Sequence, residues 1–471
     1  MIRGTLLAIL AAAAMLGAQP APSRPNILLV IADDWSYPHA GVLGDRVVKT
    51  PTFDRIARDG VLFRNAFVAA PSCTPSRASL LTGRAVHQLE EGGNLWGFLP
   101  SKFSAYPDLL EAAGYTVGFT RKGWGPGDFK AGGRPRNPAG NQFASFADFF
   151  KQASKDRPFA FWFGSQDPHR PYDEGTGASS GMKAADVVVP PFLPDTPATR
   201  GDILDYYFEV QRLDREAGEI IATLEAAGQL DNTVVIFTSD NGMPFPRAKA
   251  NLYDGGTHVP LAIRFPAKTK THRTVDDFVV LTDLAPTILE AAGLKPPAEM
   301  TGRTLMPLLA GDTQPGRDRV FLERERHAQV RRGDLGYPAR AIRNKDFLYI
   351  RNIHPDRWPA GDPEMYVSVG PFGDIDGGPT KDLLLQRPTD PAIVRFFALA
   401  TAKRSEEELY DLRKDPNQLE NVAAKPEYAT AKNALRSALL NWMRDTQDPR
   451  AADAADPWDR YPYFGPAGRD R

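Results

Sequence analysis

Cys73 is the only cysteine of the chain, and its neighbours have the types and spacing of a reactive site. Pro75 favours a helix that starts here, with residues 76–82 in helical conformation. The backbone amides and the dipole at a helix N-terminus attract anions. Arg77 lies four residues after Cys73, about one helical turn, so it can point back towards the same anion. A nucleophile, an anion-binding backbone and an arginine would together suit a sulfate or phosphate ester.

The single cysteine also has a plainer interpretation. A chain with one cysteine has no internal disulfide, although exported proteins often carry paired cysteines. An unpaired thiol in an oxidising compartment needs an explanation. Cysteine count alone favours a small buried hydrophobic residue over a modified or reactive one.

A second set of candidate residues carries only oxygen ligands. Asp33, Asp34, Asp240 and Asn241 offer carboxylates and an amide, which hard cations such as calcium and magnesium prefer. Sulfur and imidazole are absent from this set, which argues against zinc. The alternative is that each pair caps a helix or a turn.

Four apolar runs would have to position these residues as buried strands. They are nearly continuous rather than alternating, as expected when both faces of a sheet are covered. They span residues 26–32, 115–120, 159–163 and 233–238.

Polar residues follow each of these runs. The runs lead in turn to Asp33 and Asp34, to Lys122, to Asp167, Pro168 and His169, and to Asp240, Asn241 and Gly242. One aspartate after a strand means little, since aspartate starts turns. Polar residues after four separate strands predict a site, because ligands bind outside the carboxyl ends of parallel strands.

Helical patterns separate the strands. Short ones cover 53–57, 108–113 and 285–292, and a long one covers 202–227 and ends at Gly228. Strands that alternate with helices predict an α/β fold with a large, mainly parallel sheet sandwiched by helices.

After Gly311 the composition changes, with an arginine-rich stretch over 317–357. Residues 347–350 resemble a short strand and 429–443 a helix. We therefore expect a catalytic domain over 24–335 and a smaller C-terminal α+β subdomain, containing an antiparallel sheet, over 336–471. The Pro- and Gly-rich tail after Asp448 is expected to lie over the surface.

The N-terminus has the pattern of a signal peptide over residues 1–18. Arg3 supplies the positive start, 6–16 the apolar segment, and 16–18 a cleavage site of small residues. The apolar segment is too short to span a membrane, and no later segment is long and apolar enough. The alternative is an uncleaved anchor. The pattern predicts a secreted or periplasmic protein.

Composition limits the function classes. The chain has 471 residues, of which 42% are hydrophobic and 24% charged, as in globular proteins. The formal net charge of -1 supplies no overall attraction to nucleic acid or to an anionic membrane. Nothing in the sequence indicates an oligomeric state.

The cysteine motif resembles a known signature. The run from Cys73 through Pro75, Ser76 and Arg77, followed by 81–84 (Leu-Thr-Gly-Arg), is similar to that of the type I, formylglycine-dependent sulfatases of the alkaline phosphatase superfamily. Further matches lie at 24–27, 33–34, 238–242, 408–412, 415–416 and Asn421. Within the family, 167–170, 243–246 and 251–253 resemble the heparan N-sulfatase (sulfamidase)-like bacterial sulfatases.

This resemblance implies an alkaline phosphatase-like fold and a role for each matching residue. A separate maturation enzyme would oxidise Cys73 to formylglycine, whose hydrated aldehyde would be the nucleophile. The metal, usually calcium with magnesium as the alternative, would be held by Asp33, Asp34, Cys73, Asp240 and Asn241. The other catalytic positions would be Arg77 beside the formylglycine, Lys122 after the second strand, His169 facing the scissile bond, and Lys249 on the sulfate.

One departure from the family pattern stands out. Many sulfatases carry a histidine two residues after the first lysine, in the order Gly-Lys-x-His. Here Arg121 replaces the glycine before Lys122, and Trp124 stands where the histidine would be. Either Lys122 acts without that histidine, or Arg121 takes the role of the lysine.

The sequence says less about the substrate. Asn94 and Trp96, in the loop 90–96 after the motif helix, are candidate substrate contacts. Trp96 and Trp124 could stack on a sugar, and the equal alternative is that both are core residues. Arg170, Arg247 and Arg340 could bind carboxylates or further sulfates of a glycan.

A sulfated saccharide suits an exported enzyme, although the choice between O-sulfate and N-sulfate stays open. The competing hypotheses are a phosphodiesterase or phosphonate hydrolase of the same superfamily and a non-catalytic protein that binds sulfated glycans.

Overall fold

The computed structural model describes residues 24–153, 156–269, 272–367, 370–452 and 456–465. Its larger sheet has eight strands in the order β4-β3-β5-β1-β6-β7-β2-β8. These are β1 (Asn26–Ala32), β2 (Val61–Phe67), β3 (Thr116–Arg121), β4 (Asn141–Phe143), β5 (Phe159–Gly164), β6 (Thr233–Ser239), β7 (Leu261–Arg264) and β8 (Arg273–Val280). Only β7 runs antiparallel to its neighbours among these strands, which confirms the predicted mainly parallel sheet.

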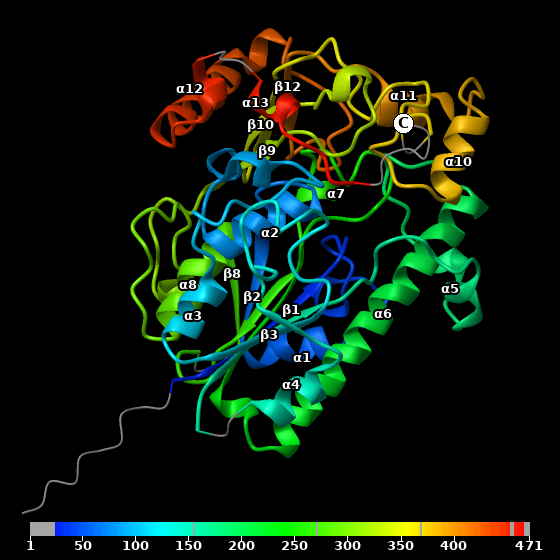
Figure 1. Cartoon of the computed structure of the whole chain (residues 1–471). Coiled ribbons are helices and arrows are strands. Elements are labelled where there is room, and N and C mark those ends of the chain that lie inside the picture. The colour runs from blue at the N-terminus through cyan, green and yellow to red at the C-terminus, as the bar shows by residue number, and fades with distance from the viewer. Residues whose placement is uncertain (1–23, 154–155, 270–271, 368–369, 453–455, 466–471) are drawn as a thin grey trace, which may run out of the picture.

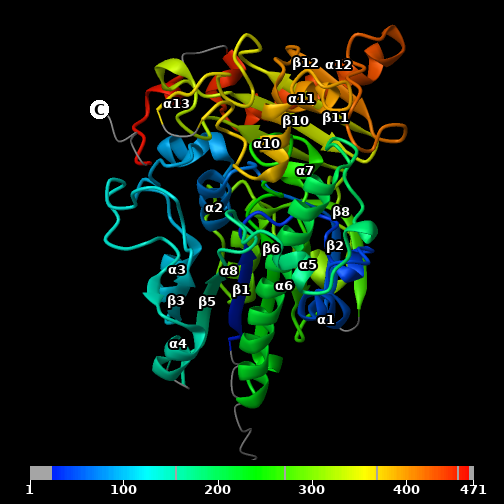
Figure 2. The ribbon, with the colours of Figure 1, turned by 90° about the vertical axis from the view of Figure 1, so that its right-hand side faces the viewer.

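Helices cover both faces of this sheet (Figures 1 and 2). One face packs against α2 (Cys73–Thr82), α3 (Tyr106–Ala112) and α8 (Leu284–Ala291). The other packs against α1 (Pro51–Asp59), α4 (Phe146–Gln152) and α6 (Pro197–Ala226). The sequence of β1 is apolar throughout because both faces of the strand are buried: Ile27 belongs to the first core and Leu28 to the second. Each such fully buried side chain stabilises the fold by roughly 1.5–3 kcal/mol.

Three further helices are short: α5 (Thr176–Ser179), α7 (Asp254–Thr257) and α9 (Met306–Ala310), and α9 adds Leu308 and Leu309 to the first core. The long helix α6 begins where Thr196 accepts a hydrogen bond from the backbone of Thr199, a normal N-cap. It ends before Gly228, whose φ of 65° lies in the left-handed region.

The C-terminal part forms a second sheet, which is antiparallel, in the order β12-β11-β10-β9. Its strands are β9 (Arg319–Arg324), β10 (Ala339–Asn344), β11 (Phe347–Asn352) and β12 (Glu407–Asp411). Helix α12 (Ala429–Asp445) packs on one face through Leu435, Leu439 and Met443. The other helices of this part are α10 (Pro379–Gln386), α11 (Val394–Thr401) and α13 (Pro457–Arg460). Figures 1 and 2 show this subdomain above one edge of the large sheet, next to α2.

The structure changes two expectations about this subdomain. The second sheet begins at β9, before the boundary predicted at 335/336, because residues 319–324 pair with β10. The tail after Asp448 does not simply lie over the surface, since Trp458 in α13 is 1% exposed. An indole carries enough apolar area to favour burial, and its N–H here donates to the Glu90 carbonyl at 3.1 Å.

The predicted signal peptide at 1–18 lies outside the described residues. Among the helices that are described, none is long and apolar enough to cross a membrane.

Candidate active site

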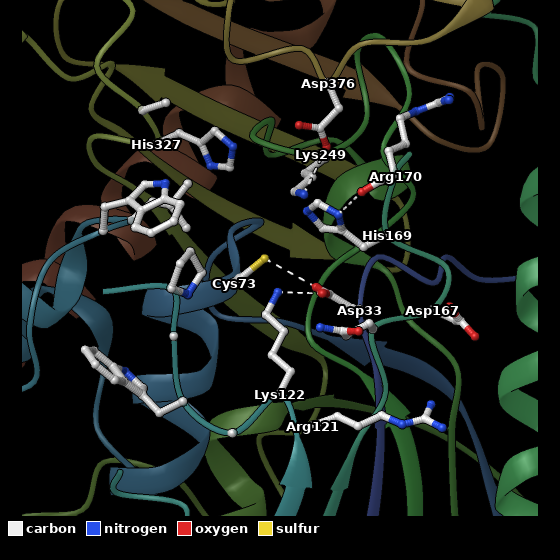
Figure 3. Close-up of a pocket in the computed structure, with 18 of the residues that line it drawn as sticks. Asp33, Cys73, Arg121, Lys122, Asp167, His169, Arg170, Lys249, His327 and Asp376 are labelled. Carbon is white, nitrogen blue, oxygen red and sulfur yellow. Dashed lines mark hydrogen bonds and ion pairs between the residues drawn. The ribbon is translucent and has the colours of Figure 1, made fainter. Parts of the chain in front are cut away.

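The carboxyl ends of four adjacent parallel strands meet at one edge of the large sheet. Strands β3, β5, β1 and β6 are neighbours in that order, so the residues that follow them converge. Ligand atoms of Asp33, Asp34, Asp240 and Cys73 lie within 4.8 Å of one another, and all four residues are buried. Figure 3 shows Asp33 and Cys73 beside Lys122, Lys249 and His169.

Cys73 is the first residue of α2 and is 2% exposed. Its thiol donates to Oδ1 of Asp33 at 3.4 Å. Burial raises the pKa of this thiol well above its ordinary value, and Asp240 and Asp33 act in the same direction against the opposing effect of Lys122. The raised pKa disfavours the thiolate, the form in which a cysteine is a good nucleophile.

Arg77 holds the site together from the inside of α2. Its Nε donates to Oδ2 of Asp240 at 2.7 Å, and its Nη1 donates to the carbonyls of Lys122 and Gly123 at 3.1 and 2.9 Å. The side chain is fully buried. One arginine thus connects the end of β6, the turn after β3 and the helix that carries Cys73.

The buried oxygen atoms fit a hard cation. Oδ1 of Asn241 is buried without a hydrogen-bond partner among the described residues. Its Nδ2 donates to Oδ1 of Asp34 at 2.6 Å, which keeps the amide beside the carboxylates. A buried polar atom without a partner costs free energy, and a cation would satisfy it. The donor set of Asp33, Asp34, Asp240 and Asn241 is the kind that calcium or magnesium takes.

Lys122, and not Arg121, reaches this centre. Lys122 Nζ donates to Oδ2 of Asp33 at 2.5 Å (Figure 3). Arg121 instead forms a bidentate pair with Glu216 of α6, at 2.5 and 2.8 Å, and its guanidinium lies over the ring of Phe163. The left-handed φ of 58° at Arg121 turns the chain so that the two side chains point to different places.

Lys249 is a second buried cation, between two carboxylates. Its Nζ donates to Asp34 at 2.7 Å and to Asp376 at 3.0 Å. Burial alone would lower the pKa of Lys249, but Asp34 and Asp376 reverse this and raise it well above its ordinary value. The two carboxylates therefore favour the charged form of Lys249.

His169 is the most exposed of the predicted catalytic residues. Its Nδ1 lies 2.5 Å from the Arg170 carbonyl, to which it donates. This hydrogen bond leaves Nε2 for the cavity, and Nε2 lies 3.9 Å from Oδ2 of Asp34. The side chain is 37% exposed, so a substrate atom can approach it.

Trp124 stands at the position of the histidine in the order Gly-Lys-x-His, but its side chain does not take the place of an imidazole in the site. It is 4% exposed and packs in the core below α2. A different histidine lines the same cavity as Cys73: His327, in the loop after β9. Its Nδ1 lies 2.8 Å from Oγ of Ser72, the residue before Cys73, and burial lowers its pKa to about 4.

His327, Asp376 and Tyr463, which were not predicted as site residues, all come from the C-terminal part and line this cavity of about 850 Å³. No local pattern marks them, because each lies in a loop that reaches the cavity only through packing.

Of the predicted substrate contacts, Trp96 and Trp124 line the cavity. Arg170 also borders it, but its guanidinium is paired with both oxygens of Asp202 at 2.7 and 2.9 Å. That pairing leaves Arg170 little capacity for a further anion.

The expectations for Asn94, Arg247 and Arg340 were wrong in placement. Each side chain is buried and bonded inside the protein. Asn94 donates to the Trp458 carbonyl at 2.8 Å, and Arg247 donates to the carbonyl of Leu399 at 3.0 Å. Arg340 pairs with Asp448 at 2.6 Å. None of the three borders the cavity. Their polar groups instead hold segments of the protein together.

Two family profiles match the chain. The sulfatase profile covers residues 25–294, and the profile of the C-terminal region of N-sulphoglucosamine sulphohydrolase covers 247–360. This chain belongs to the sulfatase family. It is a hydrolase of sulfuric esters with the fold of the alkaline phosphatase superfamily, as the cysteine motif predicted.

Relatives of this sulfatase include the N-sulphoglucosamine sulphohydrolase of Homo sapiens, which is 33% identical over 91% of each chain. An ulvan-active sulfatase of Formosa agariphila is 27% identical over 90% of this chain and 75% of its own.

Solved structures share the fold. One, in complex with its substrate D-glucosamine-2-N,6-O-disulfate, has a TM-score of 0.67 at 18% identity and covers 92% of this sulfatase and 100% of that chain. The phosphonate monoester hydrolase of Agrobacterium radiobacter has a TM-score of 0.63 at 20% identity and covers 90% and 96%.

Proposed function

We propose that this sulfatase removes sulfate from a sulfated saccharide, with a formylglycine made from Cys73 and with a calcium ion in the carboxylate cluster. The observation that carries the proposal is the environment of Cys73. Its sulfur lies among three buried carboxylates, which together with burial disfavour the thiolate, yet it lies in the centre of the site. Conversion to an oxygen nucleophile would explain both its position and its surroundings.

Formylglycine at position 73 would supply a hydrated aldehyde, whose hydroxyl is an oxygen nucleophile that could displace the saccharide oxygen or nitrogen from sulfur. The conversion needs a separate maturation enzyme as partner. Asp33, Asp34, Asp240, Asn241 and residue 73 would hold the calcium, for which magnesium is the alternative. The cation would withdraw charge from sulfate oxygens and lower the pKa of the attacking hydroxyl.

The cationic side chains would hold the charge of the transferring sulfate. Lys249 keeps its proton because Asp34 and Asp376 flank it, and Lys122 does so because Asp33 outweighs the cost of burial and raises its pKa. Arg77 fixes the Asp240 carboxylate and the turn that carries Lys122. Fixed positive charges in a buried site stabilise a spread negative charge without reorganisation.

His169 would protonate the leaving group. Its Nδ1 is committed to the Arg170 carbonyl, which sets the ring orientation and leaves Nε2 towards the cavity. Lys249 is held in its charged form, because Asp34 and Asp376 raise its pKa. We therefore assign the role of general acid to His169 and that of sulfate anchor to Lys249.

The substrate proposal rests on the relatives. N-sulphoglucosamine sulphohydrolase gives the highest identity among the proteins named above, and its C-terminal profile matches this chain. We therefore propose N-sulfated glucosamine as the first substrate to test, and other sulfated glycans next. With the leader predicted at residues 1–18, the enzyme would act in the periplasm or outside the cell.

Mass spectrometry of the peptide around Cys73, purified from the native host, tests the modification. We expect the mass of formylglycine or its hydrate, and an unmodified thiol throughout active material would overturn the proposal. The same preparation should then release sulfate from a panel that includes N-sulfoglucosamine, O-sulfated glucosamine and sulfated polysaccharides.

The alternatives predict different outcomes. A phosphonate or phosphodiester hydrolase, favoured by the fold of the Agrobacterium neighbour, would turn over aryl phosphodiesters faster than aryl sulfates. A non-catalytic glycan-binding protein would release no sulfate, and Cys73→Ala would change nothing measurable.

A further inference from the structure

The last described segment of the chain, residues 456–465, is hydrogen-bonded to the loop 90–96, which carries Trp96. Nδ2 of Asn94 donates to the Trp458 carbonyl at 2.8 Å, and the Trp458 indole donates to the Glu90 carbonyl at 3.1 Å. The Phe464 amide donates to the Trp96 carbonyl at 2.8 Å. These contacts lie on both sides of residue 463, so they hold the backbone that carries its side chain.

Arg326, two residues after the end of β9, holds the same segment from a second direction. Its Nη2 donates to the carbonyls of Tyr461 and Pro462 at 2.7 and 3.2 Å. Its own carbonyl accepts a hydrogen bond from the Leu95 amide at 3.1 Å. A fully buried arginine thus connects the C-terminal segment to the loop that carries Trp96.

Trp96 is held in an unusual backbone conformation. Its φ is 58°, in the left-handed region that non-glycine residues rarely adopt. The amide of the preceding residue, Leu95, and the carbonyl of Trp96 itself are both hydrogen-bonded. Such a conformation persists only where the surroundings impose it, and it is common at ligand sites.

The indole of Trp96 and the ring of Tyr463 form one aromatic surface. Their centroids are 6.3 Å apart with the planes tilted by 53°, and Arg326 lies 5.7 Å from the centre of the Tyr463 ring. Both rings line the cavity that contains Cys73 and Lys249. Cys73 and Lys249 are buried, and we call them the floor of the cavity. Both rings are partly exposed, so they lie nearer to solvent than this floor.

We infer that Trp96 and Tyr463 form a binding subsite for a pyranose ring of the sulfated saccharide, with the C-terminal segment as one wall of the substrate site. This rests on the proposed function. Aromatic side chains offer a large, rigid apolar face, which suits the C–H face of a sugar while its hydroxyls stay hydrated. The subsite is continuous with the floor, so a sugar whose sulfate reaches Cys73 meets these rings at the cavity entrance.

The test compares a ligand that has a sugar ring with one that has none. Steady-state kinetics with N-sulfoglucosamine give KM, and competitive inhibition by inorganic sulfate gives Ki, both with mature enzyme. Tyr463→Ala and Trp96→Ala should each raise KM about tenfold and leave Ki for sulfate unchanged, since sulfate contacts only the floor. Tyr463→Phe keeps the ring and should keep the KM.

Tyr461→Ala is the matched control, since Tyr461 lies on the same segment but does not border the cavity. Tyr463→Leu keeps a large apolar side chain for folding without an aromatic face, and should show the same rise in KM. An unchanged KM in Tyr463→Ala and Tyr463→Leu would overturn the subsite. A parallel rise in Ki for sulfate would overturn it too, because it would reveal a purely structural role. If the wild type released no sulfate from any saccharide, the proposed function would fail first.

Discussion

At the residue scale, the two neighbours Arg121 and Lys122 show how adjacent cations can have different surroundings. Arg121 is the last residue of β3 and Lys122 follows it, and both are paired with a carboxylate. Lys122 pairs with the buried Asp33, whereas Arg121 pairs with Glu216 and is 39% exposed. An exposed pair contributes little, since water competes for both ions. A buried pair contributes much more to the field of the site.

This contrast gives a paired prediction. Lys122→Met should lower kcat/KM for aryl sulfate at least about 100-fold, the usual effect of losing one stabilising charge or donor in a buried site. Arg121→Met should stay within about threefold of the wild type, because its partner lies on α6 and not in the cavity. Equal losses in both variants would contradict the placement of Lys122 alone at the centre.

The role of His169 gives a second prediction, which depends on the leaving group. His169→Ala should reduce kcat/KM for a saccharide substrate about 10²- to 10⁴-fold, because a poor leaving group needs a proton. For 4-nitrophenyl sulfate, whose leaving group needs none, the loss should be much smaller. Lys249→Met is the comparison, and should slow both substrates alike as an anchor would. A loss of equal size for both substrates in His169→Ala would refute the acid role.

At the element scale, the ends of β1 and β6 supply the carboxylates and α2 supplies residue 73. Parallel pairing of the two strands places Ala32 opposite Ser239, so the residues that follow each strand emerge together. The register therefore determines the geometry of the cation site.

A cation in this site should stabilise the fold. Removal of metal with EDTA should lower the thermal unfolding midpoint, and calcium should restore it, because a ligand that binds only the folded state stabilises it by about 2.7 kcal/mol at a hundred times its Kd. Asp240→Asn should lose this calcium-dependent rise. If calcium raised the midpoint of Asp240→Asn as much as that of the wild type, the cation would bind elsewhere.

At the scale of the whole molecule, buried charges connect the two sheets. His87, in the segment after α2, lies with Nδ1 2.8 Å from Glu323 of β9 and with Nε2 3.1 Å from the Thr446 carbonyl. Both partners only accept hydrogen bonds, so both ring nitrogens carry protons. Arg340 of β10 joins the same group through Asp448 and Glu325. Removal of one member of such a group leaves a buried charge unpaired.

The charge of His87 predicts how stability depends on pH. Burial opposes the charge, but Glu323 and Asp448 outweigh it and raise the pKa above its ordinary value of 6.5. The stabilisation is therefore complete below pH 6.5 and is lost as the pH rises through the folded-state pKa. His87→Gln should lower the free energy of unfolding in urea by about 2 kcal/mol at pH 5.5 and by clearly less at pH 8.5.

Arg55→Gln removes an exposed pair with Glu225 and serves as the control. Its effect should be small and nearly the same at both pH values. A loss in His87→Gln that did not change with pH would mean that the histidine is neutral in the folded protein.

Much of the fold and site could be predicted from the sequence, because the relevant signals are local. Continuous apolar runs indicate strands covered on both faces, and the residues that follow parallel strands must meet at one edge. That reasoning brought Asp33, Asp34, Lys122, His169 and Asp240 together before any coordinates. The motif at Cys73 was equally local, since a helix start and one turn of helix define it.

The tertiary structure alone decided which side chains complete the cavity. His327, Asp376 and Tyr463 come from loops whose course depends on how the second sheet packs against the first, and no periodic pattern encodes that packing. The same packing buried Asn94, Arg247 and Arg340, which a linear motif could not distinguish from exposed binding residues. Secondary structure follows from near neighbours in the chain. The substrate side of the site follows from contacts between residues hundreds of positions apart.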